Sequence, residues 1–137
     1  MSFGHASARF RRPSAGEPCP CGGGAFGDCC RPILDGTPAP TAERLMRSRY
    51  TAFVVGDEPH LRRSWHPRSR PETLDLDAAT TWTGLEVHRS AEDGDAATVS
   101  FTARWRQGGE RGALSETSRF VRRGGRWVYV DGDVEER

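Results

Sequence analysis

The chain contains no lysine: all 20 of its basic residues are arginine. This absence excludes Schiff-base chemistry, a lysine general base and the phosphate-binding lysine of a P-loop. The arginines are balanced by 19 acidic residues, and the formal net charge of +1 gives no overall attraction for nucleic acid. The strings Gly-x-Ser-x-Gly and His-Glu-x-x-His are absent too, so neither serine-hydrolase nor metalloprotease chemistry is indicated.

Long apolar stretches are lacking as well. No segment is long and apolar enough to span a membrane, and the N-terminus, with Arg9, Arg11 and Arg12, lacks the apolar core of a secretory signal. We therefore expect a cytoplasmic protein without a membrane partner, in a compartment that keeps cysteines reduced. With 137 residues, the chain is long enough for one domain and a small appendage.

The chain has four cysteines, and they lie in one short segment: Cys19, Cys21, Cys29 and Cys30. Two pairs of thiolates joined by the glycine-rich residues 22–24 are typical of a tetrahedral Zn²⁺ site, with Zn–S distances of about 2.3 Å. Because four thiolates leave such a site negatively charged, we expect the peptide N–H groups of residues 22–24 and the side chain of Arg31 to surround it. Two disulfides or a redox pair are the alternatives, but they need an oxidising compartment or a Cys-x-x-Cys spacing, respectively.

The composition divides the chain into three parts. Residues 1–17 are rich in glycine, serine and arginine without an apolar period, and they are predicted to be a flexible tail. Residues 18–36 form the cysteine-rich zinc knuckle, and residues 37–137 form a larger domain. The spacer of residues 37–40 contains two prolines, and such spacers join units that share few contacts.

A helix is predicted between Thr41, which is placed to cap its N-terminus, and Gly56, which is placed to end it. Apolar side chains recur between these residues at helical spacing: Ala42, Leu45, Met46, Tyr50, Phe53 and Val54. Arg47 and Arg49 are assigned to the opposite, solvent-exposed side of this helix. A second, short helix is predicted to start at Asp57.

From about residue 81 the apolar period changes from helical to alternating. Four apolar side chains then alternate with polar ones, as in a half-buried strand: Val99, Phe101, Ala103 and Trp105. Flanking strands are predicted at residues 81–89, 113–121 and 127–130, joined by short glycine-containing turns as in an antiparallel meander. The predicted fold is therefore α+β, with two or three helices packed on a curved antiparallel sheet and a cavity between them.

Several strings resemble a known bacterial family. The segment from Cys19 to Cys30 resembles the SEC-C motif, a small zinc-binding module. Four further strings resemble the YchJ-like proteins: residues 45–53, residues 65–67 together with 70–71, residues 116–120 and residues 127–132. The resemblance implies a zinc knuckle followed by a cone-shaped domain similar to nuclear transport factor two and the cystatin-like folds, and it implies no particular reaction. The loop of residues 22–28 is one residue shorter than the usual SEC-C spacing.

A group of polar and aromatic residues is predicted to converge on the cavity: Trp65, His66, Arg70 and Glu116. His66 is the candidate acid or base, and Glu116 would orient it. Each also has a structural interpretation, His66 as a helix cap and Glu116 as one partner of a buried ion pair. Arg49, Tyr50 and Trp82 are further candidates, although Tyr50 and Trp82 also fit the core as aromatic residues. None is assigned as a catalytic residue.

Three classes of function follow from these features. The first is an adaptor that docks a protein or RNA partner through the zinc knuckle, because a four-cysteine site has no open coordination position for catalysis. The second is a small-molecule binder, or an enzyme, that uses the cavity. The third is RNA binding through arginines around the knuckle: Arg9, Arg11, Arg12 and Arg31. The adaptor role is ranked first, above an enzymatic one.

Overall fold

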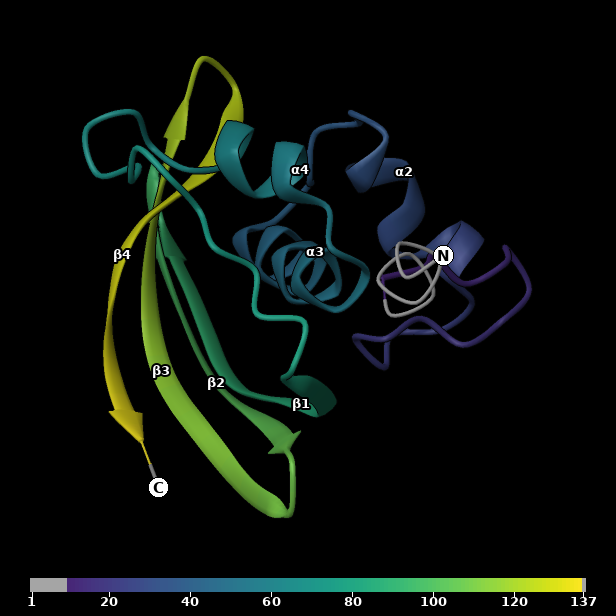
Figure 1. Cartoon of the computed structure of the whole chain (residues 1–137). Coiled ribbons are helices and arrows are strands. Elements are labelled where there is room, and N and C mark those ends of the chain that lie inside the picture. Colours follow the sequence, from purple (N-terminus) through teal and green to yellow (C-terminus); the bar gives the residue numbers. More distant parts are fainter. Residues whose placement is uncertain (1–9, 137) are drawn as a thin grey trace.

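The computed structural model describes residues 10–136, so residues 1–9 of the predicted tail lie outside the described part. Helices precede strands along the chain: the 3₁₀-helix η1 (Phe26–Asp28), α2 (Cys30–Leu34), α3 (Ala42–Val55), α4 (Glu58–Arg63), β1 (Thr81–Asp93), β2 (Ala96–Gln107), β3 (Glu110–Arg123) and β4 (Arg126–Glu136). The strands form one curved sheet, α3 lies in its concave side, and α2 lies on the far side of α3 (Figure 1). This arrangement confirms the predicted α+β fold. Among the described residues, no helix has the length and apolar character needed to cross a membrane.

Both main helices begin as their sequences predict. The Oγ1 atom of Thr41 accepts a hydrogen bond from the backbone N–H of Arg44 at 3.1 Å, which caps α3. Gly56 ends α3 with a φ of 74°, a conformation that glycine adopts without strain. Asp57 then caps α4, because its Oδ1 atom accepts from the N–H of His60 at 3.0 Å.

One side of α3 packs on the sheet. Leu45 and Met46 of α3 share a hydrophobic cluster with Val99 of β2 and Phe120 of β3. The inward direction of these strand residues follows from their alternation with polar neighbours. The sheet therefore covers the part of α3 whose apolar spacing is plain in the sequence.

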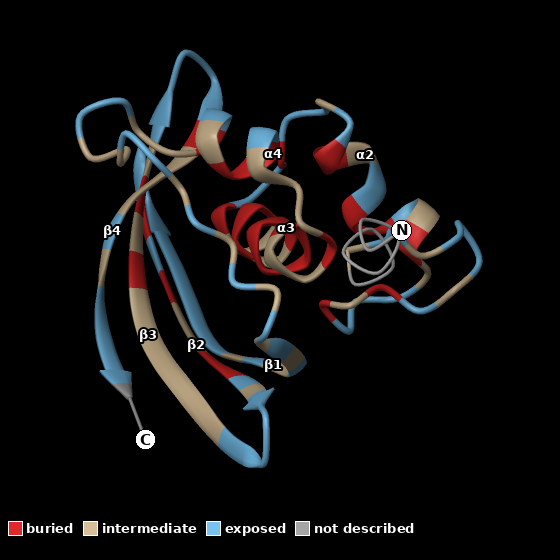
Figure 2. Cartoon of the chain, in the orientation of Figure 1, coloured by how far each residue is buried: buried red, intermediate tan, exposed pale blue. Residues whose placement is uncertain are grey.

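The other side of α3 packs on the knuckle. Phe26 and Leu34 of the knuckle share a second hydrophobic cluster with Ala52 and Val55 of α3. The expectation that the spacer of residues 37–40 joins units with few shared contacts is therefore not met. The reason is that α3 has apolar residues on more than one side, so the sheet alone leaves part of it uncovered. Figure 2 shows that most of α3 is buried.

Part of the predicted tail also contacts the folded chain. Gly56 lies so close to the ring of Phe10 that an added Cβ atom would be 2.6 Å from it. Arg12 forms an ion pair with Asp35 of the knuckle, with 2.9 Å between Nη2 and Oδ1. The carbonyl oxygen of Ala15 accepts from the N–H of Gly27 at 2.9 Å. Residues 10–15 thus lie against the knuckle and the end of α3.

The four strands pair as neighbours in chain order, and every pair is antiparallel, which confirms the predicted meander. β4 continues to Glu136, beyond the predicted end at Val130. Its acidic continuation has no apolar alternation, but backbone pairing with β3 holds it. Arg119 of β3 adds an ion pair, with 2.6 Å between its Nε atom and Oδ1 of Asp131.

The segment after α4, residues 64–66, forms backbone hydrogen bonds with the edge of β4. The N–H of Tyr129 donates to the carbonyl of Ser64, and the N–H of His66 donates to the carbonyl of Tyr129, both at 2.8 Å. The segment is therefore extended, like a short parallel strand. Because neighbouring side chains of an extended segment point to opposite sides, Trp65 and His66 face in opposite directions.

Candidate metal centre and ligand cavity

The structure brings the sulfur atoms of the four cysteines to within 4.8 Å of one another, and all four side chains are buried. The Sγ atom of Cys21 lies 3.4 Å from that of Cys29 and 3.7 Å from that of Cys30. A tetrahedron with metal–sulfur distances of about 2.3 Å has sulfurs about 3.8 Å apart. The cysteines are free thiols rather than disulfides. Both the donor set and its spacing therefore fit one metal ion.

A tight loop makes this approach of the sulfurs feasible. The N–H of Cys19 donates to the carbonyl of Gly24 at 2.7 Å, which closes the loop at its base. Gly23 passes under the sulfurs, where an added Cβ atom would be 2.9 Å from Sγ of Cys29. The loop that is one residue shorter than the usual SEC-C spacing therefore still gathers all four thiols.

Side chains of α3, and not Arg31, surround the cysteine cluster. Arg47 donates to the carbonyl of Cys21 at 2.9 Å, and Arg44 donates to the carbonyl of Cys29 at 3.2 Å. The hydroxyl of Thr51 donates to Sγ of Cys30 at 3.3 Å. Such surrounding donors hold thiolate ligands in place and offset their negative charge.

Arg31 was predicted to offset this charge, and its placement requires a correction. It is exposed and pairs with Asp35 one helical turn later, with 3.7 Å between Nε and Oδ2. The physical reason is that α2 buries Cys30 and Ile33, so the side chain of Arg31 is turned away from the cluster. Arg47 was assigned to an exposed side of α3, yet it is half-buried against the knuckle.

The thiols strongly affect one another. Hydrogen bonds from Cys21 and Cys30 hold the pKa of the Cys19 thiol far below its usual range, whereas the bond to Cys19 raises the pKa of Cys30 far above it. Burial raises the pKa of Cys29 to about 12. Four thiols this close cannot all ionise unless a cation lies between them, so a metal ion is the natural counterpart of the cluster.

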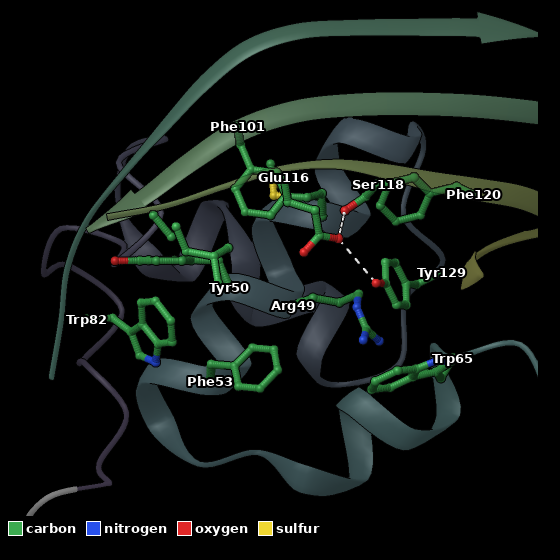
Figure 3. A pocket seen from close by; sticks show the side chains of 13 residues that line it. Arg49, Tyr50, Phe53, Trp65, Trp82, Phe101, Glu116, Ser118, Phe120 and Tyr129 are labelled. Carbon is green, nitrogen blue, oxygen red and sulfur yellow. Dashed lines mark hydrogen bonds between the residues drawn. The ribbon is translucent and has the colours of Figure 1, made fainter. Parts of the chain in front are cut away.

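A cavity of about 310 Å³ lies on the opposite side of α3, against the concave face of the sheet. Aromatic rings from α3 and from all four strands line it, among them Tyr50, Phe53, Trp82 and Phe101. Tyr50 and Trp82 meet edge to face, with ring centroids 6.3 Å apart. They therefore serve both as packed aromatic residues and as walls of the cavity (Figure 3).

Arg49 is buried in this cavity, only 6% exposed, although it was predicted to face solvent. Its Nη1 atom donates to the carbonyl of Leu61 at 2.9 Å and to Oγ of Ser64 at 2.6 Å. The rings of Trp65 and Tyr129 flank the guanidinium, with centroids 4.8 and 4.6 Å from its central carbon. Burial lowers the pKa of Arg49 to about 10, so the side chain stays charged at neutral pH.

Helical spacing explains the burial of Arg49. It lies four residues after Leu45 and four before Phe53, and residues four apart share one face of a helix. The assignment of Arg49 to the side away from these two residues was therefore wrong. The same spacing was the available signal for finding it.

Glu116 of β3 also lines the cavity, as predicted. Its Oε2 atom accepts hydrogen bonds from the hydroxyl of Ser118 and, at 3.1 Å, from that of Tyr129. Gly132 of β4 leaves room for this carboxylate, because an added Cβ atom would collide with Oε2. Burial and the nearby Glu116 carboxylate raise the pKa of Tyr129 above its usual range, so its hydroxyl remains a donor. Figure 3 shows the three side chains as one hydrogen-bonded group.

Two members of the predicted group do not line the cavity. Trp65 and Glu116 do, but His66 and Arg70 lie outside. Because His66 lies on the extended segment that pairs with β4, its side chain points away from Trp65, and its Nδ1 atom accepts from the N–H of Arg68 at 3.0 Å. Arg70 donates to the carbonyl of Trp65 at 3.0 Å, so it supports the segment from outside. The predicted pairing of His66 with Glu116 is therefore wrong.

Residues 41–132 match the family described as "YchJ, middle NTF2-like domain". The chain belongs to this family. A UPF0225 protein of Ralstonia nicotianae is 49% identical over 136 residues, which span 89% of this chain and 94% of that protein. A UPF0225 protein of Streptomyces coelicolor is 52% identical over 118 residues, which span 85% of this chain and 94% of that protein.

Solved structures of SEC-C motif containing proteins resemble this YchJ-like chain. The solution structure of such a protein from Rhodopseudomonas palustris superposes with a TM-score of 0.77 at 34% identity, covering 85% of this chain and 98% of the other. The crystal structure of another, from Psychrobacter arcticus, gives a TM-score of 0.71 at 28% identity, covering 89% and 82%. The resemblance to a YchJ-like fold with an N-terminal SEC-C knuckle is confirmed.

Sequence reasoning missed several residues of both sites in this YchJ-like chain. Around the cysteines they are Arg44, Arg47 and Thr51, which recur at spacings of three and four residues and so share a second face of α3. At the cavity they are Ser118 and Tyr129, which hold Glu116. Ser118 could have been found because it lies two residues after Glu116 on β3, and such residues share one face of a strand. Tyr129 lies on β4, and only the register between β3 and β4 brings it to Glu116.

Proposed function

We propose that this protein is a zinc-stabilised small-molecule binder, in which four cysteines hold one Zn²⁺ and the cavity beneath the sheet takes the ligand. The zinc part rests on the all-thiol donor set and the distances between its sulfurs. Zn²⁺ held by four thiolates has no open position for a substrate, so its contribution is structural. Side chains of α3 would orient the thiolates, because Arg44, Arg47 and Thr51 donate hydrogen bonds to the cysteine segment.

The binding part rests chiefly on one observation: a carboxylate and a guanidinium line a single cavity without forming an ion pair with each other. Protein interiors are close-packed, and buried opposite charges normally pair. A volume of about 310 Å³ is within the range of small-molecule sites, which combine apolar walls with a few fixed polar groups. In this cavity the aromatic rings supply the apolar walls, and Arg49 and Glu116 supply the fixed polar groups.

Docking of a protein or RNA partner on the knuckle stays a prediction. Of the arginines expected to form an RNA patch, Arg9 lies outside the described residues. Arg12 and Arg31 both pair with Asp35, at 2.9 and 3.7 Å. Their charges are therefore partly neutralised within the protein, which makes a cavity-based function the better supported one.

Filling the cavity tests the proposal. Ala103 is buried on its wall, so Ala103→Phe should occupy the space while leaving the melting temperature unchanged or higher. The probe is benzyl alcohol, titrated into the zinc-loaded full chain and followed by the amide NMR signals of residues around the cavity. We expect saturable shifts in the wild type and none in the variant.

The matched control is Thr98→Phe, an added ring at an exposed position of the same strand. It should bind benzyl alcohol as the wild type does. Equal shifts in wild type and Ala103→Phe, or no saturable shifts in the wild type, would contradict binding in the cavity.

A further inference from the structure

The polar pair in the cavity restricts the chemistry of the ligand, provided that the cavity binds a small molecule as proposed above. Arg49 comes from α3 and Glu116 from β3, and both line the same space. Within residues 10–136 neither makes an ion pair. The two charges are therefore held apart by their separate partners rather than joined to each other.

The two carboxylate oxygens of Glu116 differ in their hydrogen bonds. Oε2 accepts from Ser118 and Tyr129, whereas no donor among the described residues reaches Oε1. Glu116 is half-buried, and Oε1 is accessible to solvent through the cavity, so a ligand that displaces water from this oxygen has to replace the lost hydrogen bond. Figure 3 shows the carboxylate projecting between Tyr50 and Tyr129. A ligand that donates a hydrogen bond would complete it.

Arg49 has hydrogen-bond donors that no protein acceptor among the described residues uses. Its Nη1 atom is occupied by Leu61 and Ser64, while no acceptor within the described residues reaches Nε or Nη2. The faces of the guanidinium are covered by the rings of Trp65 and Tyr129. Only its edge is left for a ligand, and an edge of N–H groups recognises a hydrogen-bond acceptor.

Charge balance decides between ionic and neutral ligands. The positive charge of Arg49 and the negative charge of Glu116 cancel within the cavity. A ligand carboxylate on Arg49 would place a second negative charge beside Glu116, and a ligand ammonium on Glu116 would place a second positive charge beside Arg49. Because like charges repel strongly away from water, either ion is disfavoured there.

We infer that the cavity selects an uncharged molecule with a flat apolar body, whose polar group accepts a hydrogen bond from Arg49 and donates one to Glu116. A primary carboxamide has this pair of groups side by side. The rings of Phe53, Trp82 and Phe101 supply a matching surface for an aromatic body.

Three probes that share a benzyl group and differ in charge test the selection: phenylacetamide, phenylacetate and phenethylamine. Each is titrated into the zinc-loaded full chain at pH 7 and followed by amide NMR signals, with benzyl alcohol as the neutral reference. We expect the Kd of phenylacetamide to be lower than that of either ion by about tenfold or more. Tightest binding of phenylacetate, or of phenethylamine, would overturn the inference while leaving small-molecule binding intact. If no probe binds, benzyl alcohol included, the proposed function itself fails.

Glu116→Gln sharpens the test, because it removes the negative charge with little change in shape. The cavity is then left with Arg49 alone, so phenylacetate should bind about tenfold more tightly than to the wild type and phenethylamine should bind more weakly. Glu86→Gln is the matched control, since Glu86 is exposed on β1 and pairs with Arg104. It should leave the affinity for all three probes unchanged. Unchanged affinities of Glu116→Gln for phenylacetate and phenethylamine would overturn the charge-balance explanation.

Discussion

The two sides of α3 differ in how their polar groups are used. On the knuckle side, Arg44, Arg47 and Thr51 all donate hydrogen bonds to atoms of the cysteine segment. On the cavity side, Arg49 and Glu116 keep hydrogen-bonding atoms without partners among the described residues. The first pattern is that of a structural interface, and the second is that of a binding site. One helix thus separates the cysteine cluster, which can hold a metal ion, from the cavity that we propose as a ligand site.

The largest loss of stability should come from Cys30→Ser, which removes one of the four thiols of the knuckle. Metal binding by four thiolates supplies about 10 kcal/mol or more of folding free energy in small zinc modules. Because the knuckle shares a hydrophobic cluster with α3, the loss should reach the whole domain. We expect the variant to lose its zinc, with a fall of more than about 3 kcal/mol in the free energy of unfolding. Metal analysis and thermal denaturation measure both.

Arg31→Ala is the control for Cys30→Ser, because Arg31 belongs to the knuckle but forms only an exposed ion pair. It should change the free energy of unfolding by about 0.5 kcal/mol or less. A Cys30→Ser protein that keeps one zinc per chain would refute the metal site. A knuckle that unfolds alone, while residues 37–136 keep their cooperative transition, would restore the idea of two independent units.

An intermediate effect should appear at the contact between α3 and α4, as a function of pH. His60 is buried, and its Nε2 atom lies 2.9 Å from Oγ of Ser48. Burial, helped by the guanidinium groups of Arg63, Arg49 and Arg12, lowers the pKa of His60 to about 3. Below about pH 6.5, His60 is therefore protonated in the unfolded chain but stays neutral in the folded chain. Stability should therefore fall as the pH drops from about 6.5 towards 3, by up to about 1.4 kcal/mol per pH unit.

His60→Gln checks this pH dependence, because it removes the titrating ring and keeps a polar group near Ser48. We expect the variant to be less stable than the wild type at pH 8 and the difference to shrink as the pH falls to 5. Denaturant unfolding at several pH values measures it. Parallel pH curves for the two proteins would show that His60 is not the titrating group.

The smallest effect should come from one hydroxyl on the knuckle side. Thr51→Val keeps the shape of the side chain but removes the hydrogen bond to Sγ of Cys30. We expect a loss of about 1 kcal/mol in stability and of about tenfold or more in zinc affinity, measured by competition with a chelator. Thr51→Ser, which keeps the hydroxyl, should retain most of the affinity. If both variants bind zinc equally, the hydroxyl does not support the metal site.

How much the sequence predicts depends on how local the cause is. Thr41 and Gly56 bound α3 as expected, because capping depends on residues within one turn. The cysteine cluster was recognisable because its ligands lie close along the chain. The burial of Arg49 was predictable from its spacing to Leu45 and was misassigned.

The relation of His66 to Trp65 was not predictable from helix patterns. The two residues follow α4, and their opposite directions depend on backbone pairing with Tyr129, more than sixty residues away in the chain. The spacing of residues within one segment does not predict such a pairing. The same holds for Gly132 of β4, whose missing side chain makes room for Glu116 on the neighbouring strand β3.

By itself, the sequence determined the order of helices and strands, the α+β class and the set of residues that can hold a metal. These follow from caps, periodicity and ligand spacing, which act over a few residues. The tertiary structure alone decided that the knuckle and the sheet enclose α3 from two sides, and that Arg49 and Glu116 meet in one cavity without pairing. Burial and electrostatic surroundings depend on residues distant in the chain, so they exist only once the fold brings those residues together.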